Sequence, residues 1–596
     1  MVSTEELARA QVAAAPPADV RNCAEEILYL LAAHGVELLF LNPGTDSAPL
    51  QEAFAALAER GVPVPRAIVS TFESVSLAAA HGYWQATQRP QAVFVHVDVG
   101  TQNLGAVVHD VLRDRAGAVV LAGKTPYAED AGSPGARSNP IHWQQDVPDQ
   151  AGIVRPYARW TAELTRSHDT SRVVGRAVQV AAGGVPGLAY LTLSRDVLMD
   201  PPGPPELRRT TGFARPVAPA VEPRALAELA ERVAEAERPL IVTNRAGRWP
   251  GGAQALGRIS DLAAIPVIGR PEAVNLVSTH PMCVRSQSHA QSLLCGADLV
   301  LVVDCDVPWI PSTVTPAPDS FVVQIDRDPI KADMPLWSFP VDLAICADPV
   351  IALRQLGAAL ASHAASAGTR WQERRRTLEP AIAASSRSVQ DAASAEQLPA
   401  TDVRAVLLAV SETLEPECLV VEEAVSNLGP VAELLARPEP LTLYSAGGPG
   451  LGWAPGASVG IKLARPDRDV VAVVGDGAFM FGVPTATLCL AAEARAPIVI
   501  VVLNNAGYRA SRLPVLNLFP DGVSAARGEV VGTTFAQVPD FVQIAEACGA
   551  YGARTEGAQG LPQALAGALA ATREGRAALV DVRIDQGSES TAGGEG

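Results

Sequence analysis

Val-Val-Ala-Val-Val-Gly-Asp-Gly-Ala, at residues 470–478, is an apolar run that ends in Gly-Asp-Gly. A stretch of helical character follows to about residue 496, and a second apolar run at 498–503 ends in Asn504-Asn505. Both runs are far shorter than a membrane span of about 20 residues, and they predict buried strands of a parallel sheet. Because ligands bind at the carboxyl ends of such strands, Asp476 and Asn505 are expected to meet at a ligand-binding edge.

The residue types at this predicted edge suit a metal ion that holds a phosphate group. The carboxylate of Asp476 and the amide of Asn505 are hard oxygen ligands of the kind that Mg²⁺ prefers, and the neighbouring glycines let the backbone approach an anion closely. The alternative is a turn with a capping aspartate and two loop asparagines. A dinucleotide-binding Gly-x-Gly-x-x-Gly loop is excluded, because Met480 and Pro455 stand where a third Gly or Ala is required.

Length, composition and net charge limit the number of domains and the class of protein. The 596 residues suggest three or four domains at roughly 150–200 residues each. Hydrophobic residues make up 48% and charged residues 19%, which excludes a predominantly disordered chain. With 47 Lys and Arg against 64 Asp and Glu, the net charge of −17 argues against a broad nucleic-acid-binding surface.

The cysteines and the N-terminus indicate the compartment. None of the eight cysteines forms a Cys-x-x-Cys pair, so neither a zinc site nor a thiol redox motif is predicted. Glu5 and Glu6 stand where a signal peptide would carry basic residues, and no long apolar run follows them. We therefore expect a cytoplasmic protein that binds neither membranes nor nucleic acid.

Short apolar runs alternate with helical patterns along most of the chain, which predicts an α/β fold of three consecutive doubly wound parallel-sheet domains. The segment at 200–205, Asp-Pro-Pro-Gly-Pro-Pro, can continue neither a helix nor a strand and is expected to be a linker. The expected divisions are a loose N-terminus at 1–20, a first domain at 21–195, a linker at 196–221, a central domain at 222–355, a helix with a connection at 356–400, a third domain at 401–585 and a disordered tail at 586–596.

Gly-Asp-Gly followed by Asn-Asn at this spacing resembles the signature of the thiamine-diphosphate enzyme family, and the resemblance extends over nearly the whole chain. It implies thiamine diphosphate and Mg²⁺ as cofactors, with Asp476, Asn505 and the carbonyl of Gly507 as metal ligands. The glycine-rich segment at 446–453 looks like the family segment in which a bulky apolar residue, here Leu451, supports the cofactor. The other cofactor contacts that the resemblance implies are Pro449, Glu423, Ser426, Gly475, Gly477 and Ala478.

The first domain carries a second part of the resemblance. Glu73, in Thr-Phe-Glu-Ser-Val-Ser at 71–76, matches the family's catalytic glutamate, which contacts the aminopyrimidine ring of a cofactor bound by another subunit. The sequences His-Gly-Tyr at 81–83 and Gly-x-x-Asn at 100–103 accompany it, and Asn103 is a further expected cofactor contact. Alone, Glu73 would be an acid at a helix start, stabilised by the helix dipole. The resemblance implies a homodimer or homotetramer.

Two further motifs resemble benzoylformate decarboxylase more than acetolactate synthase. Asn-Pro-Gly-Thr at 42–45 and His-Val-Asp-Val-Gly-Thr-Gln-Asn at 96–103 imply catalytic roles for Thr45 and His96. The alternatives are a helix N-cap for Thr45 and a structural strand-end histidine for His96. A second catalytic histidine, expected from the central domain, is missing, since residues 304–311 read Asp-Cys-Asp-Val-Pro-Trp-Ile-Pro. This departure argues against simple benzoylformate decarboxylation.

The resemblance as a whole implies decarboxylation of a 2-oxo acid, followed by aldehyde release or by carboligation to an acceptor carbonyl. Tyr508, Arg509 and Arg512 follow Asn505 and are candidates for the substrate pocket. One alternative is a relative of the FAD-containing acetolactate synthases or oxidases, in which the glycine-containing loop at 244–252 would bind the nucleotide. The other is a non-catalytic paralogue, against which the joint presence of Glu73, Asp476 and Asn505 argues.

Overall fold

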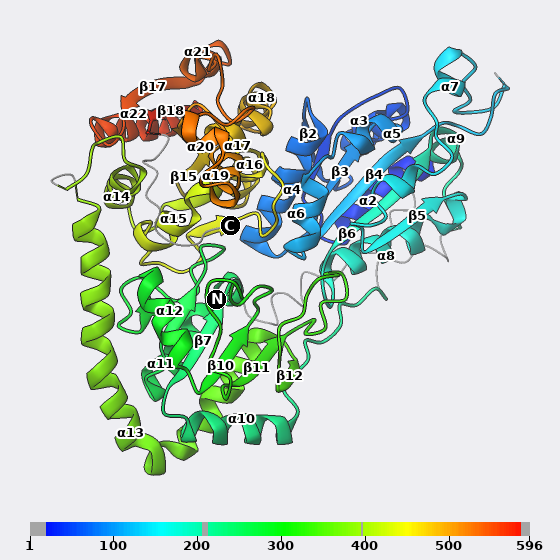
Figure 1. The fold of residues 1–596 in the computed structure, drawn as a ribbon. Helices are drawn as coiled ribbons and strands as arrows, with labels where there is room; N and C mark the ends of the chain where they lie inside the picture. The colour runs from blue at the N-terminus through cyan, green and yellow to red at the C-terminus, as the bar shows by residue number, and fades with distance from the viewer. Residues whose placement is uncertain (1–19, 131, 205–211, 395–396, 586–596) are drawn as a thin grey trace.

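The computed structural model describes residues 20–130, 132–204, 212–394 and 397–585 (Figure 1). It consists of three α/β domains, each built on a six-stranded sheet in which all the strands are parallel. The first domain lies at the upper right of Figure 1 in blue and cyan, the central domain below in green, and the third at the upper left in yellow to red. The predicted fold class is confirmed.

The first sheet has the strand order β2-β1-β3-β4-β6-β5. Helices α2, α3 and α8 cover one face, while α4 and α6 lie on the face that joins the third domain. Its strands are β1 (Leu38–Leu41), β2 (Arg66–Val69), β3 (Gln91–Val95), β4 (Ala118–Lys124), β5 (Trp160–Leu164) and β6 (Leu188–Ser194). Its α-helices are α2 (Cys23–Ala33), α3 (Ala48–Glu59), α4 (Glu73–Thr87), α5 (Val97–Gln102), α6 (Val107–Arg113), α7 (Pro140–Gln144), α8 (Thr170–Ala182) and α9 (Arg195–Met199).

The central sheet has the order β12-β11-β10-β7-β8-β9, so the chain winds outward from β7 and β10 in both directions. Its strands are β7 (Pro239–Thr243), β8 (Val267–Gly269), β9 (Cys283–Val284), β10 (Leu299–Val303), β11 (Phe321–Asp326) and β12 (Leu343–Cys346). Its α-helices are α10 (Pro223–Glu235), α11 (Gly252–Ala263), α12 (Gln287–Gly296) and α13 (Pro349–Ala392). Helix α13 has 44 residues and runs along the left edge of Figure 1 toward the third domain.

The third sheet, β14-β13-β15-β16-β18-β17, repeats the strand order of the first. Its strands are β13 (Leu419–Glu423), β14 (Leu443–Ser445), β15 (Val470–Gly475), β16 (Val499–Asn504), β17 (Tyr551–Glu556) and β18 (Ala578–Arg583). Its α-helices are α14 (Val403–Thr413), α15 (Leu428–Leu434), α16 (Trp453–Ala464), α17 (Asp476–Phe481), α18 (Pro484–Ala494), α19 (Arg509–Leu518), α20 (Val523–Arg527), α21 (Phe541–Ala547) and α22 (Leu561–Arg573).

The predicted helical stretch after Gly477 is two helices rather than one. Helix α17 ends at Phe481, and α18 begins at Pro484. Between them Val483 has a φ of 47°, a left-handed conformation that interrupts the helix, and Pro484 lacks the N–H that a continuing helix would need. The break lets α17 end beside the glycine-rich segment, while α18 returns along the sheet.

The first and third domains share one hydrophobic core through helices α4 and α16. A Cβ atom on Gly460 would overlap the carbonyl oxygen of Ala79, and one on Gly82 would overlap that of Ala457. The two helices therefore touch backbone to backbone, which only glycine permits at these positions. This contact fixes how the first and third domains are oriented relative to each other within one chain.

Two expected divisions cut through a helix of the structure. Helix α9 extends to Met199, into the expected linker at 196–221, and α13 begins at Pro349, inside the expected central domain at 222–355, and continues through most of the expected helix-and-connection segment at 356–400. The predictions for 1–19 and 586–596 lie outside the described residues. Within the described residues, no helix is both long and apolar enough to cross a membrane.

Candidate active site

Asp476 lies at the carboxyl end of β15, beside the point where the third sheet winds in two directions from β13 and β15. Open α/β sheets bind ligands at such points. Its buried carboxylate accepts hydrogen bonds from the backbone N–H of Gly477 at 2.7 Å and of Gly507 at 3.1 Å. Burial raises the pKa of Asp476 despite these hydrogen bonds. The site is thus a desolvated carboxylate that a cation would stabilise.

The two asparagines after β16 have different surroundings. Asn504 donates to Asp581 of β18 at 2.8 Å and accepts from the N–H of Ala506, so its amide is used within the fold. Asn505 Oδ1 accepts from the N–H of Gly507 at 3.1 Å, the same N–H that Asp476 Oδ2 accepts. The predicted ligands Asp476 and Asn505 are therefore brought together around Gly507.

The loop that carries Gly507 is held tightly. Ala506 has a φ of 61°, and a side chain on Gly507 would overlap the carbonyl oxygen of Thr533. The ring of Tyr508 packs over Gly477, where an added Cβ would lie 3.0 Å from it. By contrast, a Cβ on Gly475 would have no atom within 4 Å, so open space lies beside this glycine. That space adjoins Asp476, whose carboxylate meets the amide oxygen of Asn505, and it fits a metal-bound anion.

No group of three or more His, Cys, Asp or Glu side chains in the described ranges is arranged to hold a metal. The candidate cation site instead brings together the carboxylate of Asp476 and the amide oxygen of Asn505, and the carbonyl of Gly507 stays a predicted third ligand. This ligand type suits Mg²⁺ better than a transition metal.

The glycine-rich segment at 446–453 packs between the first and third domains. Gly450 donates its N–H to Asp110 of α6 at 2.8 Å, and Gly452, with a φ of 93°, lies against the backbone of Phe481 and Gly482. Leu451 is partly buried against the shared core, whereas Pro449 is exposed. The segment therefore passes directly over the end of α17, the helix that begins with Asp476.

The carboxylate of Glu423, at the end of β13, caps helix α16. It accepts from the N–H groups of Gly452 at 2.6 Å, Trp453 at 3.3 Å and Ala454 at 2.8 Å. Burial raises its pKa to about 8. The Glu423 carboxylate thus already binds three backbone N–H groups of the protein. Its contact with a diphosphate stays a prediction.

The loop after β13 also meets the helix after Asn505. Arg509 of α19 donates to Asn427 Oδ1 at 3.1 Å, and Ser426 lies in the same short turn as Asn427. Arg509 is thus tied to the loop that carries Ser426, whereas Tyr508 lies on Gly477.

Glu73 begins helix α4, at the carboxyl edge of the first sheet. Asn103 Nδ2 donates to its Oε2 at 3.2 Å, and a Cβ on Gly100 would lie 3.0 Å from its Oε1. The structure therefore brings Glu73 and Asn103 together. Among the described residues, no hydrogen bond or ion pair joins Glu73 to the third sheet.

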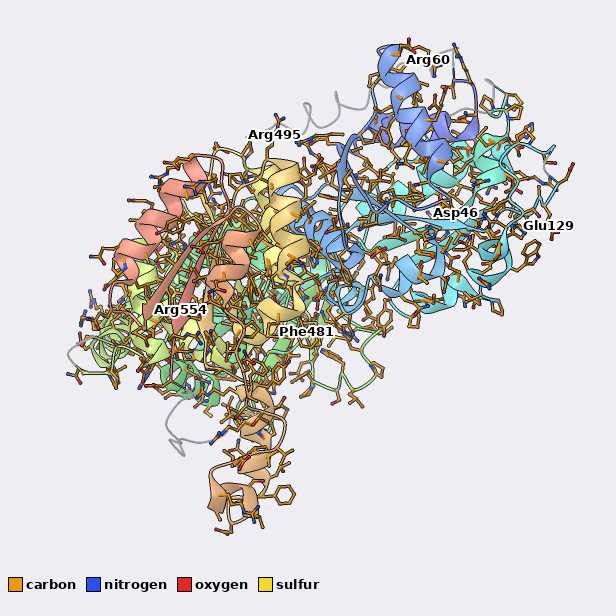
Figure 2. The ribbon with its side chains drawn as sticks, turned by 90° about the horizontal axis from the view of Figure 1, so that it is seen from above. Asp46, Arg60, Glu129, Phe481, Arg495 and Arg554 are labelled. Carbon is orange, nitrogen blue, oxygen red and sulfur yellow. The ribbon has the colours of Figure 1, made fainter. Side chains whose placement is uncertain are left out.

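Thr45 and His96 lie at the ends of β1 and β3, the two strands at which the first sheet changes winding direction. Between them is Asp46, a fully buried carboxylate, whose Oδ2 lies 3.4 Å from His96 Nδ1. Arg137 donates from Nη1 to Thr45 Oγ1 at 2.7 Å and lies 3.0 Å from Asp46 Oδ1. Figure 2 shows Asp46 within the first domain and Phe481 in the third.

Sequence reasoning missed Asp46 and Arg137. The signal for Asp46 was its position next to Thr45. No local signal pointed to Arg137, which lies 92 residues from its partner Thr45, in an irregular connection between β4 and α7.

In the central domain, protein groups fill the loop at 244–252. Arg245 pairs with Asp306 at 2.8 Å and with Asp304 at 3.4 Å. A side chain on Gly247 or Gly252 would overlap a backbone carbonyl, of Val274 or Ala246 respectively. These glycines are therefore explained by packing and do not call for a flavin.

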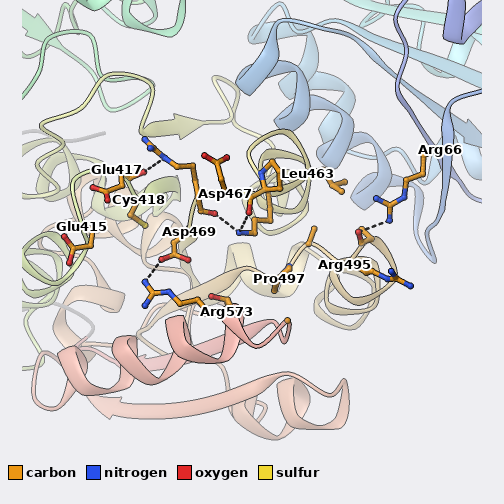
Figure 3. Close-up of a pocket in the computed structure, with 17 residues that line it drawn as sticks. Arg66, Glu415, Glu417, Cys418, Leu463, Asp467, Asp469, Arg495, Pro497 and Arg573 are labelled. Carbon is orange, nitrogen blue, oxygen red and sulfur yellow. Dashed lines mark hydrogen bonds and ion pairs between the residues drawn. The ribbon is translucent and has the colours of Figure 1, made fainter.

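A cavity of about 830 Å³ lies at the opposite edge of the third sheet (Figure 3). Arg66, Lys462, Asp469 and Arg573 are among its lining residues, and Asp469 pairs with Arg573 at 2.8 Å. Asp469 immediately precedes β15, whereas Asp476 follows it. This cavity is therefore separate from the candidate active site.

Three family models match the chain, in the order of its three domains. The thiamine pyrophosphate enzyme N-terminal TPP binding domain matches residues 21–153, the central domain 226–356, and the C-terminal TPP binding domain 427–582. Together they match more than half of the chain, and they support thiamine diphosphate (thiamine pyrophosphate) as its cofactor.

Curated relatives and solved structures agree with these matches. Benzoylformate decarboxylase of Pseudomonas aeruginosa is 27% identical over 91% of this chain and 96% of its own. A probable acetolactate synthase large subunit of Methanocaldococcus jannaschii is 22% identical over 88% and 86%. A solved thiamine diphosphate-dependent 4-hydroxybenzoylformate decarboxylase of Rhodococcus jostii has the same fold, with a TM-score of 0.73 at 21% identity, and the match covers 95% of this chain and 99% of that one. The chain belongs to the thiamine pyrophosphate enzyme family and is a thiamine-diphosphate-dependent lyase or carboligase.

Proposed function

We propose that this enzyme requires Mg²⁺ as well as thiamine diphosphate, and that it removes CO₂ from a 2-oxo acid. It then releases an aldehyde or joins the remaining fragment to a second carbonyl compound. The observation that carries the proposal is the convergence of Asp476 and Asn505 on the N–H of Gly507, beside the open space at Gly475. The similarity to benzoylformate decarboxylase over 91% of the chain supports a 2-oxo acid as the substrate class.

Asp476, Asn505 and the carbonyl of Gly507 would hold Mg²⁺, which would hold the diphosphate. The backbone of residues 475–478 would lie along that diphosphate, because Gly475 leaves room for it. Leu451 would support the cofactor from the glycine-rich segment, which already lies over the end of α17. Pro449 and Ser426 would contact the cofactor from flanking loops.

When bound, thiamine diphosphate supplies a carbon nucleophile and an electron sink for decarboxylation. Glu73 would activate the cofactor by exchanging a proton with a ring nitrogen through Oε1. The hydrogen bond from Asn103 to Oε2 orients the carboxyl group for this role. The glycine at position 100 leaves the room that Oε1 occupies.

Thr45 and His96 would act on the substrate. Thr45 is an exposed residue at the sheet edge, and its hydroxyl would donate to the substrate carboxylate, whereas His96 would deliver the proton that follows CO₂ loss. His96 is partly exposed, at 21% of its side chain, so its ring can reach a ligand.

We also propose that a second copy of the chain completes each site, in a homodimer or homotetramer. The contacts of Glu73 stay within the first domain, whereas the candidate metal ligands lie in the third. A partner chain would bring its own Glu73 to the cofactor. Active protein that is monomeric by light scattering at assay concentration would overturn this arrangement.

The test of the function is a panel of 2-oxo acids, incubated with and without an acceptor aldehyde and followed by CO₂ release and mass spectrometry. Release of CO₂ from at least one acid, dependent on thiamine diphosphate, is expected. Aldehyde as the sole product would identify a decarboxylase, and a 2-hydroxy ketone a carboligase. No CO₂ release from any acid by cofactor-loaded protein would refute the proposal.

A further inference from the structure

We propose that Arg137 and Asp46 are positioning residues that orient the hydroxyl of Thr45 and the ring of His96 toward the substrate. This inference rests on the proposed function of Thr45 and His96. It adds two residues that the family motifs did not indicate, and it assigns them a role through Thr45 and His96 rather than contact with the substrate.

The four residues come from the carboxyl edge of three neighbouring strands. Thr45 and Asp46 follow β1, His96 follows β3, and Arg137 belongs to the connection after β4. Glu129, which belongs to the same connection, lies at the outer rim of the domain, whereas Asp46 lies farther inside it (Figure 2). The side chains of Asp46 and Arg137 are buried, with 0% and 4% exposed, whereas Thr45 is exposed. Asp46 and Arg137 therefore lie on the buried side of the exposed Thr45 and support it from the interior of the domain.

The hydrogen bond from Arg137 fixes the direction in which Thr45 can donate. Because Nη1 of Arg137 donates to Thr45 Oγ1 at 2.7 Å, the hydroxyl already accepts one hydrogen bond and has its own proton left to give. The acceptor recorded for that proton is Asp46 Oδ2 at 3.5 Å, which is a long contact. A substrate oxygen at a normal distance would compete well with it.

Asp46 acts in the same way on His96. Asp46 Oδ2 lies 3.4 Å from Nδ1, which has no hydrogen-bond partner in the described part of the chain, so the negative charge of the carboxylate would favour a proton on that nitrogen. Nε2 is then free to exchange a proton with the substrate. The ring also lies against Gly44, where an added Cβ would overlap it. Val97, the next residue, has a φ of 39°, a strained conformation for a β-branched residue.

The buried position of Arg137 lowers the stability of the fold, and packing alone does not explain why an arginine stands there. Its Nε and Nη2 are buried and find no hydrogen-bond partner in the described part of the chain. Unsatisfied buried donors destabilise a fold. Arg195 nevertheless holds the adjoining backbone in place, donating to the carbonyls of Gly135 and Ala136 and, at 3.2 Å, to that of Thr45. A guanidinium kept at such a cost beside Thr45 is expected to serve the site.

The charge balance of the pair suits decarboxylation. Arg137 Nη1 lies 3.0 Å from Asp46 Oδ1, so the opposite charges of the two side chains balance each other. The substrate carboxylate would therefore contact the neutral hydroxyl of Thr45 rather than an unbalanced positive charge. A bare cation would bind the substrate carboxylate most tightly before CO₂ leaves, when its negative charge is greatest. Such binding favours the ground state over the transition state.

Two double-mutant cycles test the proposal on the cofactor-loaded enzyme, with the best 2-oxo acid of the panel. Arg137→Gln should lower kcat by about 10–100-fold, less than the 10²–10⁴-fold of a direct acid or base. In a Thr45→Val background, Arg137→Gln should lower kcat by less than about threefold, because the effects of substitutions at residues that act together are not additive. Likewise, Asp46→Asn should lower kcat when it is made in the wild type, but it should leave kcat almost unchanged when it is made in a His96→Ala background.

Controls separate positioning from folding. Arg374→Gln removes a similarly buried arginine of α13 and should lower the melting temperature with kcat unchanged. Thr45→Ser, which keeps the hydroxyl, should keep the coupling to Arg137. Thiamine diphosphate affinity, measured by tryptophan fluorescence, should stay within about threefold of wild type in all Arg137 and Asp46 variants.

Non-additivity in both cycles supports the proposal, and additive effects in either cycle overturn it. If Arg137→Gln fails to fold, the cycle of Asp46 with His96 decides alone. Absence of CO₂ release by the wild type would instead refute the proposed function, so the two failures are distinguishable.

Discussion

Asp476 Oδ2 and Asn505 Oδ1 accept hydrogen bonds from a single backbone N–H, that of Gly507, each at 3.1 Å. The two residues follow neighbouring parallel strands, which brings their side chains to one edge of the sheet. The shared N–H then holds the two oxygens on one side of the loop. These two oxygens are of the hard type that Mg²⁺ prefers, which is the basis of the proposed cation site.

Replacing Asp476 by Asn should weaken retention of thiamine diphosphate severely. The change keeps the size of the side chain but removes the negative charge that would hold Mg²⁺. Cofactor content after gel filtration, measured by mass spectrometry, should fall at least tenfold. The matched control is Asp469→Asn, which precedes β15 and pairs with Arg573 at the other edge of the sheet. Since a surface ion pair contributes only about 0–1 kcal/mol to stability, Asp469→Asn should fold normally and retain the cofactor. An equal loss of bound cofactor in Asp476→Asn and Asp469→Asn would contradict the assignment of Asp476 as a metal ligand.

Glu73 and His96 should act at different stages. Glu73→Gln keeps the shape but removes the acid, so it should slow exchange of the cofactor's C2 proton with D₂O by about 10²–10⁴-fold. His96→Ala should leave that exchange nearly unchanged, yet slow turnover or alter the ratio of aldehyde to carboligation product. NMR of the exchange, beside product analysis, measures both. If His96→Ala slows exchange as much as Glu73→Gln does, the assignment of separate stages is wrong.

Gly460→Ala should destabilise the junction of the first and third domains. The new Cβ would overlap the carbonyl oxygen of Ala79, so helices α4 and α16 must move apart, at a cost of about 1–3 kcal/mol. Urea unfolding followed by circular dichroism measures the loss. Gly368 of α13 has no atom within 4 Å of an added Cβ. Gly368→Ala should therefore stabilise the protein by about 0.5–1 kcal/mol, and a stability gain at both glycines would show that the helices do not touch.

Asp110 should make stability depend on pH. Burial, with smaller contributions from the nearby acids Glu423 and Asp114, raises its pKa to about 8 from the ordinary value of 3.8. Between these values the folded state keeps a proton that the unfolded state loses, so stability is lost as pH rises, by at most about 1.4 kcal/mol per pH unit.

Asp110→Asn keeps an acceptor for the N–H of Gly450 and removes the titration. The free energy of unfolding, measured from pH 5 to 8, should fall less steeply with pH in this variant than in the wild type. The exposed Asp467→Asn serves as the control and should keep the wild-type slope. An unchanged slope in Asp110→Asn would show that Asp110 does not bind the proton.

Local patterns predicted the fold and the meeting of Asp476 and Asn505 at one sheet edge, because strand-forming runs and the Gly-Asp-Gly and Asn-Asn motifs are contiguous in sequence. The break between α17 and α18 was missed, although Gly482, at the end of α17, and Pro484, at the start of α18, are residue types that commonly mark helix boundaries. The surroundings of Thr45 were missed for another reason. Arg137 reaches it from an irregular connection, and only the folded sheet brings the two together.

The most direct test of the account is metal-dependent reconstitution. Protein stripped of metal with EDTA should bind thiamine diphosphate weakly and release no CO₂ from 2-oxo acids. Adding Mg²⁺ together with thiamine diphosphate should restore CO₂ release in the wild type but not in Asp476→Asn. Full CO₂ release by the stripped protein with thiamine diphosphate alone, or its restoration in Asp476→Asn, would contradict the assignment of Asp476, Asn505 and Gly507 as the site that holds the cofactor.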